Sequence, residues 1–166
     1  MVLAAAFGLA ACGGARGAAS ASPRTVSVFD LRPHECLNPP KANPNFAVAS
    51  VTVVPCTSAH YDEVYCVLPY SSTPPAVGHC NPRRFAGSLT EDYPGQQALT
   101  NFANAACLNE FQPYVGSAYT DSSLYFTYLY PSPRSWDDAT KRDRMVVCVI
   151  HTTGAPLTRS VKRSRL

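Results

Sequence analysis

The sequence predicts an α+β fold, in which a small antiparallel sheet of about four to five strands carries one main helix and disulfides staple the whole. Three observations predict it. Segments rich in β-branched and aromatic residues alternate with proline-containing loops, one segment alone has helical periodicity, and six cysteines share the same part of the chain. Charged residues make up only 15%, against 46% hydrophobic residues, which is typical of a globular chain and excludes an acidic or basic disordered one.

The strands are expected where apolar or β-branched residues gather between turn signals. A cluster of three prolines between Asn38 and Asn45 excludes regular pairing there, and Pro55 ends the strand that precedes it. Residues 69–88 are rich in proline, serine and glycine, and residues 131–141 contain the only tryptophan, Trp136. We therefore expect strands at 26–31, 47–54, 61–68, 124–130 and 145–151, with loops at 69–88 and 131–141.

The one convincing helix lies between Pro94 and Gly116. Proline is tolerated in the first turn, and the acidic residues before it suit the positive end of a helix dipole. Apolar residues then recur at intervals of three and four, and Pro113 and Gly116 are expected to stop the helix. The residues that form the apolar stripe are Leu99, Phe102, Ala103, Ala106, Cys107 and Phe111.

The first residues resemble an export signal. Met1 to Ala11 is uncharged and apolar but too short to span a bilayer, and Leu9-Ala10-Ala11-Cys12 resembles the bacterial lipobox. That resemblance implies cleavage before Cys12 and a diacylglycerol on its thiol. The missing N-terminal positive charge suggests that the true start lies upstream; the alternative is an alanine-rich terminus with a chance cysteine. We expect a signal peptide at 1–11, a flexible tether at 12–25, one domain at 26–157 and a basic disordered tail at 158–166.

The cysteine count agrees with this division. Once Cys12 is assigned to lipid, an even set of six remains, which outside the cytoplasm predicts three disulfides. The sequence alone does not choose among the possible pairings. A pairing of chain neighbours is preferred, and a zinc site is the alternative, although neither C-x-x-C nor H-x-x-x-H spacing is present. The preferred pairs are Cys36–Cys56, Cys66–Cys80 and Cys107–Cys148, with no cofactor and no metal.

The basic residues concentrate at the end of the chain, at Arg159, Lys162, Arg163 and Arg165. The domain before them is therefore near neutral although the whole chain carries +3. We read the tail as a solvated end and expect no nucleic-acid partner. Anionic lipid headgroups or wall polymers are the nearest alternative partners, through attraction that salt weakens.

The segment from Val53 to Tyr65 reads Val-Val-Pro-Cys-Thr-Ser-Ala-His-Tyr-Asp-Glu-Val-Tyr. It resembles the C-x-x-x-H-x-x-E-V-aromatic signature of septum-formation family proteins, which are actinobacterial exported or membrane-tethered proteins. Further features follow in the family's order: Tyr93-Pro94-Gly95 opening the helix, the Trp136 loop, and Asp143-Arg144 ahead of Cys148. The resemblance covers about residues 31 to 155. Where the family has Gly-Asp-Cys this chain has His34-Glu35-Cys36, and the family's Gly-Asp-Arg becomes Arg142-Asp143-Arg144.

The candidate site residues that follow from this motif are His60, Asp62, Glu63 and Tyr65, with Trp136, Asp143 and Arg144 beyond them. Cys56 and His60 form a nucleophilic pair only if Cys56 is a free thiolate. The structural alternative, in which His60 and Glu63 cap the turn, is preferred.

The other groups have structural readings as well. A metal held by His60, Asp62 and Glu63 lacks a clear fourth ligand, because His34, His79 and His151 are distant in sequence. Trp136 with Asp137 and Asp138 suggests a sugar-binding surface, but a core anchor with solvated acids is preferred. Asp143 and Arg144 are expected to form a structural ion pair or to pair with the turn carboxylates.

Together these features predict a membrane-anchored extracytoplasmic lipoprotein on the outer face of the cell membrane. The resemblance implies a non-enzymatic binding or scaffolding role in cell-envelope or division-septum processes. Its partner would be an envelope or division protein or a wall polymer. The alternative is an envelope-acting thiol or hydrolytic enzyme that uses Cys56 and His60.

Overall fold

The computed structural model describes residues 22–39, 48–72, 80, 92–140 and 143–166. They form one six-stranded antiparallel sheet, in the order β1-β3-β2-β4-β6-β5, and one main helix. The predicted α+β class is confirmed, with one strand more than the range expected. The elements are β1 Arg24–Ser27, a 3₁₀ turn Val28–Asp30, β2 Cys36–Asn38, β3 Ser50–Val54, β4 Asp62–Pro69, α1 Gln96–Val115, a 3₁₀ turn Tyr119–Asp121, β5 Tyr125–Leu129, α2 Pro133–Asp137 and β6 Met145–His151.

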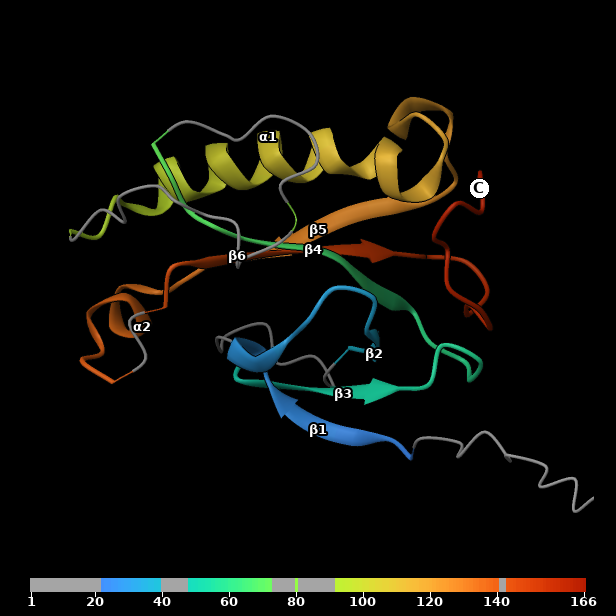
Figure 1. Cartoon of the computed structure of the whole chain (residues 1–166), viewed down its shortest axis with the longest axis horizontal. Coiled ribbons are helices and arrows are strands. Elements are labelled where there is room, and N and C mark those ends of the chain that lie inside the picture. Colours follow the sequence, from blue (N-terminus) through green and yellow to red (C-terminus); the bar gives the residue numbers. More distant parts are fainter. Residues whose placement is uncertain (1–21, 40–47, 73–79, 81–91, 141–142) are drawn as a thin grey trace, which may run out of the picture.

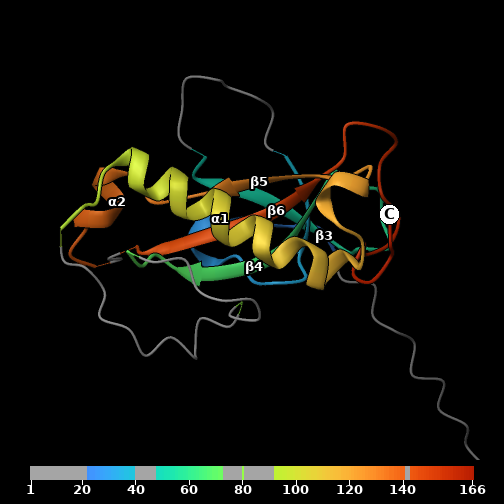
Figure 2. The ribbon, with the colours of Figure 1, turned by 90° about the horizontal axis from the view of Figure 1, so that it is seen from above.

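The molecule has three levels, as Figure 1 shows. Helix α1 lies on one face of β4, β6 and β5, and β1 and β3 lie below the opposite face. Viewed from above, α1 runs across these strands (Figure 2). A continuous sheet can occupy two levels only by curling, so its first half folds back beneath its second half. The sheet thereby encloses apolar side chains on both of its faces.

Two hydrophobic clusters occupy the spaces between these levels. The larger lies under α1 and includes Leu99, Phe111 and Trp136. The smaller lies inside the curl of the sheet, where side chains of β2 and β3 meet those of β4 and β6. Its buried members are Leu31, Leu37, Val51, Val53, Val64, Val67, Val147 and Val149.

The central strands show how one sequence serves both clusters. In β6, Val147 and Val149 face the curl, whereas Val146, Cys148 and Ile150 face α1. This is the plain alternation of a strand that is covered on both sides. In β4 the pairing register shifts between Val64 and Cys66, and this bulge lets the neighbours Tyr65 and Cys66 both join the cluster under α1.

The three disulfides follow the predicted pairing of chain neighbours, which is confirmed. Cys36–Cys56 joins β2 to the residue that follows Pro55, and Cys107–Cys148 joins α1 to β6. Cys66–Cys80 joins β4 to a residue of the loop expected at 69–88. Most of that loop, His79 and the whole N-terminal segment with Cys12 lie outside the described residues.

Three local expectations need correction. The expected strand 26–31 begins earlier, at Arg24 within the expected tether, and turns into a 3₁₀ helix at Val28, because Ser27 accepts a hydrogen bond from the Phe29 N–H and ends the strand. Helix α1 continues past Pro113 and ends at Gly116, whose φ of 86° and N–H bond to the Gln112 carbonyl form a left-handed cap. The expected loop around Trp136 contains helix α2, which Ser132 and Ser135 start with a reciprocal capping box.

The tail expected to be disordered from residue 158 is instead packed against the domain. Val161 is only 1% exposed, and the N–H groups of Arg163 and Arg165 donate to the Tyr114 and Val115 carbonyls. These carbonyls belong to the last turn of α1, where basic side chains also suit the negative end of the helix dipole. The composition suggested a solvated end because basic residues predominate in this segment and the one apolar anchor, Val161, lies among them. In the part of the chain that the structure describes, none of the helices combines the length and the hydropathy of a membrane-spanning segment.

Candidate functional site

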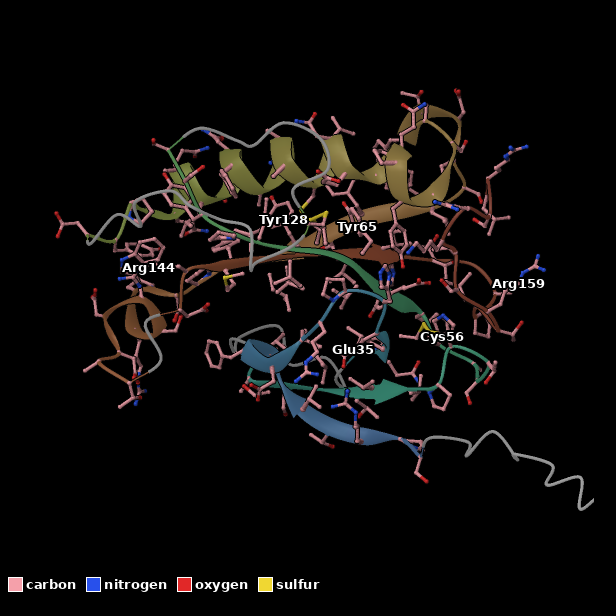
Figure 3. The ribbon with its side chains drawn as sticks, viewed as in Figure 1. Glu35, Cys56, Tyr65, Tyr128, Arg144 and Arg159 are labelled. Atoms are coloured by element: carbon pink, nitrogen blue, oxygen red, sulfur yellow. A yellow bond between two sulfur atoms is a disulfide. The ribbon has the colours of Figure 1, made fainter. Side chains whose placement is uncertain are left out.

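The structure separates the candidate residues into two groups. Cys56 lies at the end of the sheet where strand β4 begins. Strand β4 carries Asp62, Glu63 and Tyr65. Figure 3 places Arg144 at the opposite end of the molecule from Cys56. The residues of the family-like motif therefore cannot form a single site with Trp136 and Arg144.

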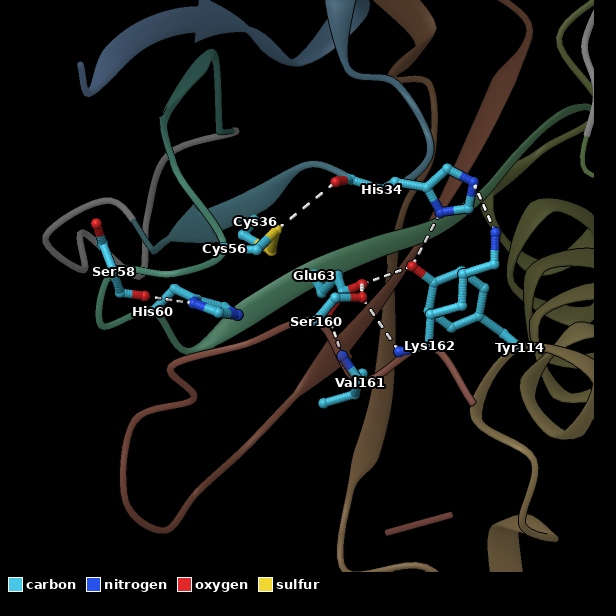
Figure 4. Close-up of a disulfide and its surroundings, with 10 residues drawn as sticks. All are labelled: His34, Cys36, Cys56, Ser58, His60, Glu63, Tyr114, Ser160, Val161 and Lys162. Atoms are coloured by element: carbon cyan, nitrogen blue, oxygen red, sulfur yellow. Dashed lines mark hydrogen bonds between the residues drawn. A yellow bond between two sulfur atoms is a disulfide. The ribbon is translucent and has the colours of Figure 1, made fainter. Parts of the chain in front are cut away.

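Glu63 is the centre of the first group. The residue is fully buried, yet its carboxylate is well satisfied: Oε1 accepts from the Tyr114 hydroxyl at 2.5 Å and from the Ser160 hydroxyl at 2.6 Å. Oε2 accepts from the Val161 N–H at 2.8 Å. Figure 4 shows these bonds joining β4, α1 and the C-terminal segment. Buried charges persist only with such partners, so Glu63 links three parts of the chain.

A chain of hydrogen bonds leads from Glu63 to the surface. Because Tyr114 Oη donates to Glu63, it accepts from His34 Nδ1 at 3.0 Å, and His34 Nε2 then offers its lone pair to Lys162 Nζ at 3.4 Å. Partial burial and then the neighbouring Lys162 lower the pKa of His34, which favours this neutral ring. Burial and then the Glu63 carboxylate raise the pKa of Tyr114 and keep its proton in place. No pattern in the sequence indicated Tyr114, Ser160 or Lys162 as partners of these residues.

His34 has a backbone conformation that glycine usually adopts. Its φ is 76°, in the left-handed region that side chains disfavour by roughly 1–2 kcal/mol. Here the histidine stacks on Tyr114, with ring centroids 5.5 Å apart, and bonds to its hydroxyl. These contacts offset the backbone cost.

His60 is fully buried in the turn before β4. Its Nδ1 lies 2.7 Å from the Ser58 carbonyl, which can only accept, so Nδ1 carries the proton. Its backbone also exchanges hydrogen bonds with Leu157. These contacts agree with the expected turn-capping role of His60, whereas Glu63 binds α1 and the C-terminal segment instead of the turn. They leave Nε2 as an acceptor, and no described residue donates to it.

The sulfur atoms beside His60 are oxidised in this structure. Cys36 Sγ, a His60 ring nitrogen and a Glu63 oxygen lie within 4.8 Å of one another, as the ligands of a metal would. Cys36 is bonded to Cys56, however, and so provides no thiolate, while Glu63 already accepts three hydrogen bonds. In this state the cluster suits neither a metal ion nor a nucleophilic Cys56.

Asp62 and Tyr65 have structural partners. Asp62 Oδ1 lies 2.6 Å from His151 Nδ1, which joins β4 to β6, and burial raises the pKa of Asp62 against the opposing effect of His151. The Tyr65 hydroxyl donates to the Cys107 carbonyl at 2.7 Å inside the cluster under α1, where burial raises its pKa.

Trp136 is a core anchor, as expected. It is 1% exposed, and the rings of Tyr70 and Tyr93 meet it edge-on, so it offers no open platform to a sugar. The Arg144 guanidinium lies 3.8 Å from the centre of the Trp136 ring and donates to the Trp136 carbonyl at 2.6 Å. The Asp143 carboxylate accepts from the Met145 N–H at 3.0 Å and so starts β6.

A cavity of about 650 Å³ lies on the side of β4, β5 and β6 away from α1. Its walls are mostly apolar and come from both halves of the curled sheet, whereas polar side chains near α2 form one end. It is lined by Val28, Phe29, Leu31, Val48, Ala49, Val67, Tyr128, Leu129, Tyr130, Ser132, Arg134, Ser135, Asp138, Asp143, Met145 and Val147. Only the curl of the sheet brings these residues together, so no local sequence pattern indicates the cavity.

Comparisons with known proteins identify no relative. No family model, no curated protein and no solved structure matches the chain. The resemblance to septum-formation proteins therefore rests on the sequence motifs alone.

Proposed function

We propose that this protein is a membrane-anchored extracytoplasmic lipoprotein with a non-enzymatic binding role in cell-envelope or division-septum processes. The cavity inside the curled sheet carries the proposal. Its volume of about 650 Å³ is in the range of small-molecule sites, which are usually apolar with a few polar groups that orient the ligand.

The lining favours one class of ligand. Apolar side chains such as Val67, Leu129 and Met145 suit an apolar body, and the polar end around Ser132 and Arg134 suits a polar head. We infer that the cavity takes the apolar part of an amphiphilic envelope component. A protein tethered to the membrane would meet such molecules at high local concentration.

The three disulfides support the placement outside the cytoplasm, because disulfides persist in oxidising compartments. They also use every cysteine except Cys12, which leaves that thiol for lipid. Mass spectrometry of the protein purified from its native membrane is expected to find an acylated peptide that begins at Cys12. An unmodified Cys12 would contradict the anchor.

Binding at the cavity can be tested with N-phenyl-1-naphthylamine, an apolar dye that fluoresces away from water. We expect the oxidised protein to bind the dye, and Ala49→Trp to weaken binding at least tenfold, on the order of 1.4 kcal/mol. Ala49 is exposed and lines the cavity, so the larger ring would obstruct it without crowding the core.

Leu108→Trp is the matched control. Leu108 is 46% exposed on α1, and α1 and the cavity lie on opposite sides of the strands. It should bind the dye as the unmodified protein does. Absence of dye binding, or equal binding by the Ala49→Trp protein, would overturn the assignment of the cavity.

A further inference from the structure

The two sulfurs of the Cys36–Cys56 disulfide differ in accessibility. Cys36 is fully buried in β2, whereas Cys56 is partly exposed in the turn after β3. In the Cys107–Cys148 disulfide both residues are fully buried. Since exchange requires a thiolate to reach a sulfur atom, Cys56 is the residue of the first pair that an attacking thiolate can reach.

The buried side of the same disulfide faces an unsatisfied acceptor. His60 Nδ1 donates to Ser58, so Nε2 holds a lone pair, and no described residue donates to it although the side chain is fully buried. Figure 4 shows the ring pointing from Ser58 toward the space beside the disulfide and Glu63. Cys36 Sγ, a Glu63 oxygen and one of the His60 ring nitrogens lie within 4.8 Å of one another. A carboxylate carries no proton to give, so Cys36 is the neighbour that can become a donor, and only as a thiol.

The partly exposed cysteine, Cys56, has a similar neighbour. Cys56 Sγ lies 3.8 Å from the His34 carbonyl oxygen, within reach of a sulfur hydrogen bond. A disulfide sulfur has no hydrogen, so this is a contact without a bond in the oxidised protein. Both cysteines therefore lie beside acceptors that only their reduced forms would use.

From this arrangement we propose that Cys36–Cys56 is a redox-active pair that undergoes thiol–disulfide exchange with a dithiol. A thiolate of the dithiol attacks Cys56 Sγ, the Cys36–Cys56 bond breaks, and its electron pair goes to Cys36 Sγ. Cys36 takes a proton from solvent and donates it in a hydrogen bond to His60 Nε2. The second thiolate of the dithiol then attacks the first sulfur of the same dithiol molecule, which is bonded to Cys56 in the mixed disulfide. This step releases Cys56 as a thiolate, which is protonated. The dithiol is oxidised to a disulfide, and the protein gains two electrons and two protons.

His60 is a positioning residue in this scheme. Its Nε2 lone pair is unsatisfied in the oxidised protein and satisfied in the reduced protein. His60 therefore shifts the exchange equilibrium toward the reduced form of Cys36 and Cys56. Removing that acceptor while keeping the bond to Ser58 should shift the equilibrium back. Asparagine has this property, because its amide N–H₂ can occupy the place of Nδ1 and nothing replaces Nε2.

The test uses the oxidised full chain equilibrated in dithiothreitol redox buffers, quenched by alkylation and read by peptide mass spectrometry. We expect Cys36–Cys56 to open in buffers at least tenfold less reducing than those that open Cys107–Cys148. His60→Asn should shift the Cys36–Cys56 equilibrium about tenfold toward the disulfide, or about 30 mV for two electrons. His60→Gln, whose amide reaches the Nε2 position, should lie closer to the unmodified protein.

Two results would overturn the proposal. One is an exchange equilibrium that His60→Asn changes by less than twofold. The other is opening of Cys36–Cys56 only together with Cys107–Cys148, which would mark general unfolding. The Cys107–Cys148 pair serves as an internal control in each variant, since loss of stability would affect it as well. Dye binding at the cavity is a separate measurement, so a failure of the redox proposal can be distinguished from a failure of the proposed binding function.

Discussion

Replacing both Cys107 and Cys148 by alanine is expected to lower the free energy of unfolding by about 4 kcal/mol. The bond closes a loop with a sequence separation of 41 residues, and loop-closure entropy grows with that length. It also joins α1 directly to β6 within the larger hydrophobic cluster, where both cysteines are fully buried. Urea unfolding under non-reducing conditions measures the change.

The matched control is the double alanine variant of Cys66 and Cys80. Its sequence separation is 14, for which the same relation gives about 3 kcal/mol. We therefore expect the Cys107–Cys148 variant to be the less stable of the two by about 1 kcal/mol. A loss below about 1 kcal/mol at Cys107–Cys148 would show that packing alone holds α1 on the sheet.

Replacing Glu63 by leucine is expected to cost at least about 3 kcal/mol, because each unsatisfied buried donor costs roughly 1–3 kcal/mol. The donors left without an acceptor would be the Tyr114 hydroxyl, the Ser160 hydroxyl and the Val161 N–H. The same substitution should free the C-terminal segment from β4. Hydrogen exchange at the Val161 amide, measured beside urea unfolding, reports both effects.

Tyr114→Phe separates the carboxylate from one of its partners. It removes the bond to Glu63 and the acceptor of the partly buried His34 Nδ1, but it leaves the Ser160 and Val161 donors satisfied, so we expect a loss of about 1 kcal/mol. Equal losses in the Tyr114→Phe and Glu63→Leu proteins would contradict the picture of Glu63 as a shared acceptor. Unchanged exchange at Val161 in the Glu63→Leu protein would contradict its role in holding the C-terminal segment.

Local patterns in the sequence were sufficient for the elements with strong periodicity. Strand β6 has the predicted bounds because the centre of Met145–His151 is a continuous apolar run, typical of a strand that is covered on both faces and paired on both sides. Helix α1 was predictable from its apolar stripe, and Gly116 from the need for a left-handed cap. An even cysteine set, paired between chain neighbours, led to the three disulfides.

The short strand β2 escaped prediction because three residues carry too little pattern. Cys36–Asn38 is a strand only because β3 and β4 supply hydrogen-bonding partners on both of its edges. The bulge in β4 likewise breaks the alternation that a sequence pattern would need. Pairing, rather than propensity, decides both features.

By itself, the sequence determined the fold class, the main helix and the existence of three disulfides, because each depends on residues close together in the chain or on a count. Only the tertiary structure decided that Ser160 and Val161 satisfy Glu63, since 97 and 98 residues separate them from it. It also decided that the sheet curls around a cavity and that His60 faces Cys36 with an unused acceptor. Such contacts depend on which distant segments of the chain meet in the fold, and local propensity and periodicity do not predict which segments these are.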